Sequence, residues 1–349
     1  MPLIAWLYWN PPQVAFTLPI LDRPIYWYGI LFVTGFILGY FLLNPIFRTF
    51  LNHSHRLTAI ANVKQTSYFL TDRLCWFVVL GTLIGARLGH VFFYDWHYFQ
   101  HHPLEILQIW RGGLASHGGT VGVLLGLYLF VLYVRRWVPT LTYLKLIDMV
   151  SIPAALVAGF IRLGNFMNQE ILGTPSDLPW AVVFGHAADG SGPLPRHPVQ
   201  LYEAAAYFLT FALLYQLWKR RGECLPIGTT FIISSERPAG CKEASVKDCS
   251  SAIAKAIPSS QSLTSPPFRS SGSCDEIMKV VPVGTYSGLM FICIFGSRFI
   301  LEFWKDRIDA SLSIPYLEIG QLLSLPLIGF GVFLIYSHRL IRHHKETSS

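Results

Sequence analysis

The stretch IYWYGILFVTGFILGYFLLN, Ile25–Asn44, runs for 20 residues without a charged side chain. An α-helix needs about 20 mainly apolar residues to cross the hydrocarbon core of a bilayer, so this stretch predicts a membrane-spanning helix. Further apolar runs of similar length follow at Leu74–Tyr94, Leu114–Tyr133, Leu146–Gly164, Leu201–Trp218, Val283–Phe303 and Tyr316–Tyr336. The sequence therefore predicts an all-α, polytopic membrane protein with about seven transmembrane helices.

The composition agrees with a membrane protein. Hydrophobic residues make up 52% of the 349 residues and charged residues only 13%. Soluble domains average about 25% charged residues, so the composition excludes an ordinary soluble globule. The six cysteines form no C-x-x-C pair, and we expect no disulfide scaffold in a chain of this length. The first twenty residues contain no Lys or Arg, so they predict a short extended or amphipathic lead-in rather than a cleavable signal peptide.

The charge distribution predicts an orientation. The chain has 27 Lys and Arg against 20 Asp and Glu, which gives a net charge of +7. Nineteen of the basic residues follow odd-numbered spans and five lie in the opposite segments, while Arg87, Arg162 and Arg298 lie within or at the rim of spans. Cytoplasmic segments are enriched in Lys and Arg, so we expect the N-terminus outside and the C-terminus in the cytoplasm. No nucleic-acid partner is needed to explain the charge.

A tract of different composition separates the fifth and sixth spans. Residues 234–280 contain twelve serines and four prolines, and we predict a disordered cytoplasmic insert there. The insert divides the chain into residues 1–233, with the first five spans and the outward-facing motifs, and residues 281–349, with the last two spans and a basic tail. Four cysteines lie in or beside the insert, with spacings of 17, 8 and 25 that favour free thiols over a zinc site: Cys224, Cys241, Cys249 and Cys274.

Ionisable side chains inside hydrocarbon are costly, so each one is a candidate for function. Arg87 lies in GARLGH, Gly85–His90, and either binds an anion or carbonyl group or is a structural arginine between helices. His117 lies in RGGLASHGGTVG, Arg111–Gly122. A lone histidine is usually structural, but two flanking glycine pairs predict a sharply bent backbone that approaches a ligand beside the imidazole.

The motif RLGNFMNQEILG, Arg162–Gly173, carries the densest set of polar side chains. Arg162 is followed by Asn165, Asn168 and Glu170, so a guanidinium group, two amides and a carboxylate fall within nine residues. Arginine matches phosphate oxygens with two hydrogen bonds, so this set suits a phosphate group and neighbouring hydroxyls. The alternative is a capped helix end, but a cap needs one such residue, not four.

Two further motifs lie near the outer ends of the fifth and sixth spans. They are RHPVQLYE, Arg196–Glu203, and GSRFILE, Gly296–Glu302. Arg298 and Glu302 are four residues apart and share one helix face, so we expect them to neutralise each other. This pairing is compatible with a catalytic role, because a carboxylate can orient an arginine that binds substrate. All these polar groups fall in the outer half of the bilayer, which favours a lipid headgroup or an exported polypeptide as substrate.

These motifs together resemble those of the bacterial prolipoprotein diacylglyceryl transferases. The resemblance extends over all seven predicted spans and rests on YWYGILFVTGF at Tyr26, GARLGHVFFYD at Gly85, HGGTVG at His117, RLGNFMNQEILG at Arg162, RHPVQLYEA at Arg196 and SRFILEFWKD at Ser297. It implies transfer of the sn-1,2-diacylglyceryl group from phosphatidylglycerol to the lipobox cysteine of prolipoproteins, forming a thioether in the first step of lipoprotein maturation. It also implies the bacterial inner membrane as location, with the active site towards the outer leaflet. We expect no cofactor and no metal.

The motifs and the resemblance together predict the site. We expect catalytic roles for His117, Arg162, Arg298 and Glu302. We expect substrate binding, in this case of phosphatidylglycerol and the prolipoprotein signal peptide, by Tyr28, Arg87, Gly118, Gly119, Asn165, Asn168, Glu170, Gly173, His197 and Glu203. The chain departs from the family at Ile294, where many members have a tyrosine, and at Gln169, where glycine is common.

The chemistry suggests roles for these residues. Attack by sulfur needs a thiolate, so a base or a cationic group is useful, and we expect His117 to accept or orient the thiol proton. The leaving phosphate ester needs its growing charge held, which we expect of Arg162 and Arg298.

Two other functions remain as alternatives. A solute transporter or channel is disfavoured because the polar groups cluster at one face and no inverted repeat of broken helices is evident. An intramembrane protease is disfavoured because the spans contain no aspartate dyad, Asp148 standing alone, and no Ser–His pair at plausible depth.

Overall fold

The structure is a computed structural model that describes residues 6–19, 22–54, 62–109, 112–222, 282–306 and 318–346. The described helices belong to one compact unit. The long ones are α1 (Trp27–Ser54), α2 (Val63–Phe93), α4 (Ser116–Val134), α5 (Tyr143–Met167), α6 (Val199–Gly222), α8 (Thr285–Leu301) and α9 (Ile319–Glu346). The predicted insert and its four cysteines lie outside the described residues.

Every predicted span coincides with a helix, but several helices are longer than expected. The helix α1 continues to Ser54 and α2 begins at Val63, so the basic residues Arg48, Lys64 and Arg73 lie on helices rather than in loops. Within the described residues, six helices are long and apolar enough to cross a membrane, and α6 is not among them. The reason is that α6 is less apolar, with Gln200, Glu203 and Thr210 buried in it and a Lys-Arg-Arg end.

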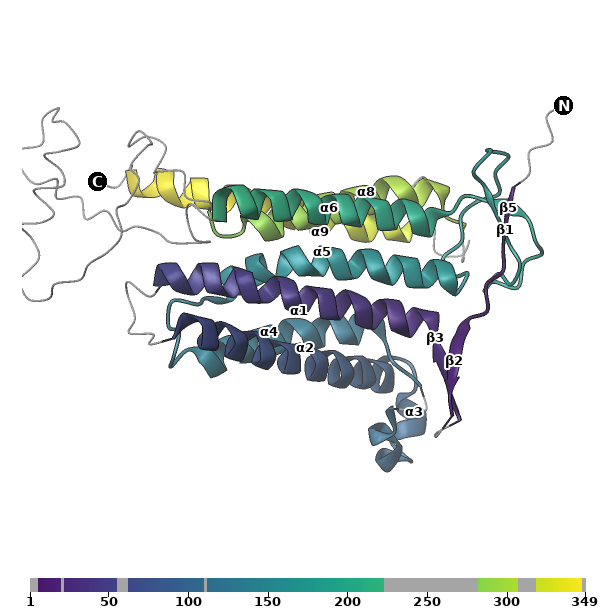
Figure 1. Cartoon of the computed structure of the whole chain (residues 1–349), viewed down its shortest axis with the longest axis horizontal. Coiled ribbons are helices and arrows are strands. Elements are labelled where there is room, and N and C mark those ends of the chain that lie inside the picture. Colours follow the sequence, from purple (N-terminus) through teal and green to yellow (C-terminus); the bar gives the residue numbers. More distant parts are fainter. Residues whose placement is uncertain are drawn as a thin grey trace, which may run out of the picture. The chain divides into compact units, whose positions relative to one another are not determined.

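The helices pack in layers (Figure 1). The helices α1 and α5 pack against each other, with the pair α2 and α4 on one side of them and α6, α8 and α9 on the other. Successive long helices run in opposite directions, so α1, α4, α6 and α9 begin at the end of the bundle where α2, α5 and α8 finish. The short strands lie at this same end, which we call the strand end.

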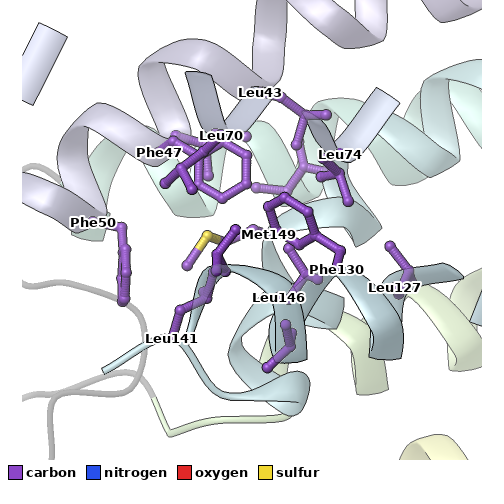
Figure 2. Packing of buried hydrophobic residues seen from close by; sticks show 14 of the residues in the cluster. Leu43, Phe47, Phe50, Leu70, Leu74, Leu127, Phe130, Leu141, Leu146 and Met149 are labelled. Atoms are coloured by element: carbon purple, nitrogen blue, oxygen red, sulfur yellow. The ribbon is translucent and has the colours of Figure 1, made fainter. Parts of the chain in front are cut away.

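The main apolar core lies between the helices (Figure 2). Most of its buried members come from α1, α2, α4 and α5. The others are Val138 and Leu141 in the connection between α4 and α5, Leu214 of α6 and Tyr286 of α8. Figure 2 shows Phe47, Leu70, Leu74, Phe130 and Met149 converging from different helices. Within a bilayer the alternative to these contacts is lipid rather than water, so close van der Waals packing of these side chains stabilises the contacts between the helices.

Short strands at the strand end correct the all-α expectation. The strand β1 (Leu7–Trp9) runs parallel to β4 (Val182–Phe184), which pairs antiparallel with β5 (Pro195–Arg196). A separate antiparallel hairpin joins β2 (Val14–Leu18) to β3 (Arg23–Tyr26). Within the described residues 6–19 this segment contains two extended strands, in line with one of the two alternatives predicted for the first twenty residues. The pairing itself was not predictable, because strands of two to five residues are too short to show a periodic pattern.

A second apolar cluster holds the segment after α5 onto the bundle. It consists of Phe166, Leu172, Val182 and Phe184, with Trp9 packed against it. The Trp9 ring stacks on Phe166 at 4.6 Å between centroids, and its indole N–H donates to the Phe166 carbonyl oxygen at 3.2 Å. The N-terminal strand therefore clamps the polar segment that follows α5.

Candidate active site

Six ionisable side chains lie at the strand end, joined by ion pairs or linked through Asn165 and Tyr207, and we call them the ionic cluster. The helix α5 contributes Arg162, α6 contributes Glu203, and α8 contributes Arg298 near its last turn. The segment after α5 contributes Glu170. The turn η3 (Glu302–Trp304) and the residue after it contribute Glu302 and Lys305.

Glu203 is the centre of the ionic cluster. It is fully buried, and its carboxylate oxygens lie 2.7 Å from Nε of Arg162 and 3.0 Å from Nζ of Lys305. The same ammonium group lies 2.8 Å from Oε2 of Glu302. A buried carboxylate requires such partners, because an isolated charge away from water is very costly. The chain Arg162–Glu203–Lys305–Glu302 therefore ties together α5, α6 and the turn after α8.

The polar side chains of the Arg162–Gly173 motif also come together. Nη1 of Arg162 donates to Oδ1 of Asn165 at 3.0 Å, and the Asn165 amide donates to Oε1 of Glu170 at 2.7 Å. The Asn168 amide lies 3.4 Å from the same carboxylate oxygen. Asn168 is also the residue at which α5 ends, but its backbone N–H makes the bond to the Gly164 carbonyl oxygen, so its side chain does not act as the cap that the alternative predicted.

Two tyrosines border this network. Tyr28 of α1 packs on Gly164, where an added Cβ would lie 2.7 Å from its ring, and it is close enough to Glu170 and Arg162 to interact electrostatically. Tyr207 lies one turn after Glu203 on α6 and is buried. Its ring centroid is 5.9 Å from the guanidinium carbon of Arg162.

The expected neutralisation of Arg298 by Glu302 does not occur. The backbone N–H of Glu302 still bonds to the Arg298 carbonyl oxygen, so the helical spacing persists at this residue, but the Glu302 carboxylate binds Lys305 instead of Arg298. Glu302 pairs with Lys305 and lies against Gly320 in the first turn of α9. In the part of the chain that the structure describes, the half-buried Arg298 guanidinium has no ion pair or hydrogen bond. It faces Tyr207, whose hydroxyl it affects electrostatically.

Gly173 and His197 lie beside the turn that carries Lys305. Gly173 forms an antiparallel bridge with Lys305, and a Cβ added at Gly173 would lie 2.7 Å from Cβ of His197, so only glycine fits there. Nδ1 of His197 lies 3.4 Å from the Tyr202 hydroxyl, and the ring is 6.5 Å from that of Trp304. Burial lowers the pKa of His197, which favours a neutral imidazole at this position.

His117 lies apart from the ionic cluster. It is exposed in the first turn of α4 and lines an apolar groove of about 900 Å³ between α2 and α4. Gly118 is part of the helix contact, because a Cβ there would lie 2.7 Å from the Gly89 Cα. The expected sharp bend occurs only earlier, at Gly112 and Gly113 with φ of 88° and 71°. Gly118 and Gly119 lie within the regular helix α4, so the backbone does not bend sharply at the second glycine pair as predicted.

The Arg87 side chain forms hydrogen bonds to a loop. Its guanidinium donates to the carbonyl oxygens of Glu105 at 2.6 Å, Ile106 at 2.9 Å and Gly112 at 2.7 Å, and it lies 4.9 Å from the Phe99 ring centroid. These partners belong to the connection between α2 and α4, which contains α3 (Trp96–Phe99) and η1 (Pro103–Leu107). The arrangement favours the structural alternative, in which Arg87 holds the loop that leads to His117.

Sequence reasoning did not single out Lys305 and Tyr207 as site residues. Lys305 is one of the five basic residues on the outward side, and it lies three residues after Glu302, a spacing that can bring two side chains together. Tyr207 follows Glu203 by four residues, a spacing that places both on one face of α6. Those two spacings were the signals available in the sequence.

Comparison with known proteins identifies the family of this chain. A profile of the prolipoprotein diacylglyceryl transferase family matches residues 13–235. A phosphatidylglycerol–prolipoprotein diacylglyceryl transferase of Protochlamydia amoebophila is 42% identical, with 95% of each chain covered. Proteins of the same name from Tolumonas auensis and Chloroherpeton thalassium are 36% and 33% identical, covering 94% and 95% of this chain and 96% and 94% of theirs. The chain belongs to the prolipoprotein diacylglyceryl transferase family.

The two departures from the transferase family pattern have local explanations. Ile294 packs against the main apolar core, where an aliphatic side chain is well accommodated. Gln169 has φ of 54°, a left-handed conformation that explains why glycine suits this position. Its side chain is buried, and its amide oxygen accepts the His186 backbone N–H at 2.7 Å. This hydrogen bond offsets part of the strain that a non-glycine residue brings.

Proposed function

We propose that this protein transfers the diacylglyceryl group of phosphatidylglycerol to the lipobox cysteine of a prolipoprotein, the first step of lipoprotein maturation. The family supports the reaction type, and the names of its relatives supply both substrates. The observation that carries the proposal is Arg298, a half-buried guanidinium without an ion partner among the described residues, at the edge of a network that holds Arg162. A phosphate group is the natural partner for such a cation.

The proposed step is a substitution at carbon. The cysteine thiolate attacks the glycerol carbon that bears the phosphate ester, so a C–S bond forms and the C–O bond breaks. Glycerol phosphate leaves with the electron pair, and Arg162 and Arg298 stabilise the charge that grows on its oxygens. Asn165 and Glu170, joined by a hydrogen bond of 2.7 Å, position the headgroup, and Tyr28 closes its side. The walls of the headgroup site are proposed to include Glu302, His197, Asn168 and Gly173.

His117 is proposed as the group that accepts or orients the thiol proton. The groove that it lines is almost entirely apolar, as a site for a hydrophobic signal peptide or lipid chain should be. An imidazole at the end of such a groove would meet the polar end of its occupant. Gly118 and Gly119 then act by letting α4 approach α2, and Arg87 by fixing the preceding loop.

The strand end is proposed to face the outer leaflet of the bacterial inner membrane, with the N-terminus outside and the C-terminus in the cytoplasm. Basic residues at the opposite end support this orientation, because cytoplasmic ends are enriched in them: Arg48, Lys64, Arg135, Arg136, Lys145, Lys219 and Arg220. The helix α6, the fifth along the chain, is proposed to span the membrane as well, which brings the number of spans to seven. It packs on α5 and α8, so its polar side chains face protein rather than lipid.

The test is a transfer assay on isolated membranes or purified protein. Labelled phosphatidylglycerol and a lipobox peptide are incubated with the protein, and the peptide is analysed by mass for diacylglyceryl on its cysteine. We expect modification with the natural peptide and none with a Cys→Ser peptide. A purified protein that modifies no peptide under these conditions would contradict the proposal. A variant lacking residues 234–280 is expected to remain active, because the site lies wholly outside that segment.

A further inference from the structure

Lys305 contacts two carboxylates at once. Its ammonium nitrogen lies 3.0 Å from Oε1 of Glu203 and 2.8 Å from Oε2 of Glu302. The side chain is only 10% exposed, so water and salt screen these contacts weakly. A lysine ammonium group has three donors, which allows both contacts to exist together.

The backbone around Lys305 is fixed from both sides. The Thr174 N–H donates to the Trp304 carbonyl oxygen at 2.8 Å, and the Asp306 N–H donates to the Leu172 carbonyl oxygen at 3.0 Å. Arg196 in turn binds the Asp306 carboxylate. The backbone that carries Lys305 is therefore fixed before the ammonium group contacts Glu203 and Glu302, which reduces the conformational entropy lost in forming the two contacts.

The charges of the ionic cluster balance only when Lys305 is included. The cluster has three cations and three carboxylates: Arg162, Arg298, Lys305, Glu170, Glu203 and Glu302. Glu203 forms ion pairs with Arg162 and Lys305, and Glu302 forms one with Lys305. Glu170 accepts hydrogen bonds from the Asn165 and Asn168 amides. Arg298 is the cation that remains. Without Lys305 the cluster would carry one net negative charge, which repels an incoming anion and attracts the Arg298 guanidinium.

We propose that Lys305 is a positioning residue for an anionic headgroup: by neutralising Glu203 and Glu302 it keeps Arg298 available for the phosphate group of the lipid. This inference rests on the proposed function. Lys305 need not touch the lipid, since its effect passes through the two carboxylates. The phosphate of a lipid and that of free glycerol phosphate present the same chemistry to Arg298, so both serve as probes.

Two readouts test the proposal on the full-length protein. The first is the KM for phosphatidylglycerol in mixed micelles, measured separately from kcat and from the KM for the lipobox peptide. The second is binding of glycerol phosphate to the detergent-solubilised protein, measured as a rise in the thermal unfolding midpoint, which needs no turnover. For Lys305→Met we expect a KM for phosphatidylglycerol about tenfold higher, an unchanged KM for the peptide, and glycerol phosphate binding about tenfold weaker.

Compensating variants separate positioning from a general structural role. Lys305→Arg keeps the charge and should bind both probes within about threefold of wild type. Lys305→Met combined with Glu302→Gln restores the balance of charge and should recover glycerol phosphate binding. Glu302→Gln alone leaves a net positive cluster and should strengthen that binding, a result that does not depend on the folding of the Lys305→Met protein.

The outcomes distinguish this inference from the proposed function. An active wild-type enzyme whose Lys305→Met variant keeps its KM for phosphatidylglycerol would overturn the role of Lys305. So would a loss of glycerol phosphate binding that the double variant does not recover. A wild-type protein without transfer activity would instead contradict the proposed function itself.

Discussion

Asp148 of α5 accepts two hydrogen bonds from Ser287 of α8, one from its backbone N–H at 2.9 Å and one from its hydroxyl at 2.6 Å. The same carboxylate accepts the Gly284 N–H at 2.6 Å, and Gly284 has φ of 92° at the start of α8. The first N–H groups of a helix have no partner within it, and a carboxylate is favoured beside them. Asp148 thus caps α8 from a neighbouring helix.

Replacing Asp148 with Ala should destabilise the helix bundle. Two buried N–H groups and one hydroxyl would lose their acceptor, and we expect the free energy of unfolding to fall by about 2–4 kcal/mol. The measurement is unfolding of the detergent-solubilised protein by heat or denaturant. Ser151→Ala on the same helix is the matched control, because among the described residues the Ser151 hydroxyl bonds to the Ile147 carbonyl within α5 and to no other helix. Equal stability of the two variants would contradict the capping role.

The sequence alone predicted the helices well because their signal is strong. A run of about 20 apolar residues has few explanations, and each predicted span coincides with a helix. The helix ends were less predictable. Arg48 and Lys64 end the apolar pattern, yet α1 and α2 continue through them, because a helix can extend past the hydrocarbon region into water.

Some members of the ionic cluster were predictable from the sequence, but their pairings were not. The motif residues Arg162, Asn165 and Glu170 do meet. The Arg298–Glu302 pair does not form, because the Glu302 carboxylate binds Lys305 instead, a choice of partner that the four-residue spacing does not reveal. Contacts between distant segments, such as Glu203 with Lys305, are set by the tertiary arrangement, and a single sequence contains no local pattern for them.

Arg162→Ala should abolish transfer while the protein still reaches the membrane. Removing a cation that stabilises the leaving phosphate is expected to lower kcat by at least about 10²-fold. Glu203 keeps Lys305 as a partner, so most of the fold should survive. The assay compares transfer per amount of membrane-inserted protein. Arg136→Ala, an exposed arginine at the opposite end of the bundle, is the control and should keep full activity. Near-normal transfer by Arg162→Ala would refute the assignment.

His117→Gln separates a base from a hydrogen-bond donor. Glutamine can still donate a hydrogen bond but cannot take the thiol proton at neutral pH, so we expect kcat to fall by about 10²–10⁴-fold if the imidazole is the base. The side chain is exposed and lines a groove, so stability should not change. The control is His97→Gln in α3, an exposed histidine outside the groove. Full activity of the His117 variant, with an unchanged pH–rate profile, would rule out base catalysis there.

Gln169 allows a test of the left-handed backbone that follows α5. With φ of 54°, a side chain at this position is strained by about 1 kcal/mol, which glycine avoids. Gln169→Ala keeps the strain and also removes the acceptor of the His186 N–H, so it should unfold more easily than wild type by about 0.5–1.5 kcal/mol. Gln169→Gly loses the same hydrogen bond but relieves the strain, so it should be about 1 kcal/mol more stable than Gln169→Ala.

The neighbouring Asn168 provides the matched comparison for this order. Its φ of −79° is right-handed, so glycine there gains nothing in the folded state and loses more entropy on folding. Asn168→Gly should therefore be less stable than Asn168→Ala by about 0.5–1 kcal/mol, the reverse of the order at Gln169. Unfolding midpoints of the four variants decide the matter. The same order at both positions would show that backbone conformation does not explain the preference for glycine at position 169.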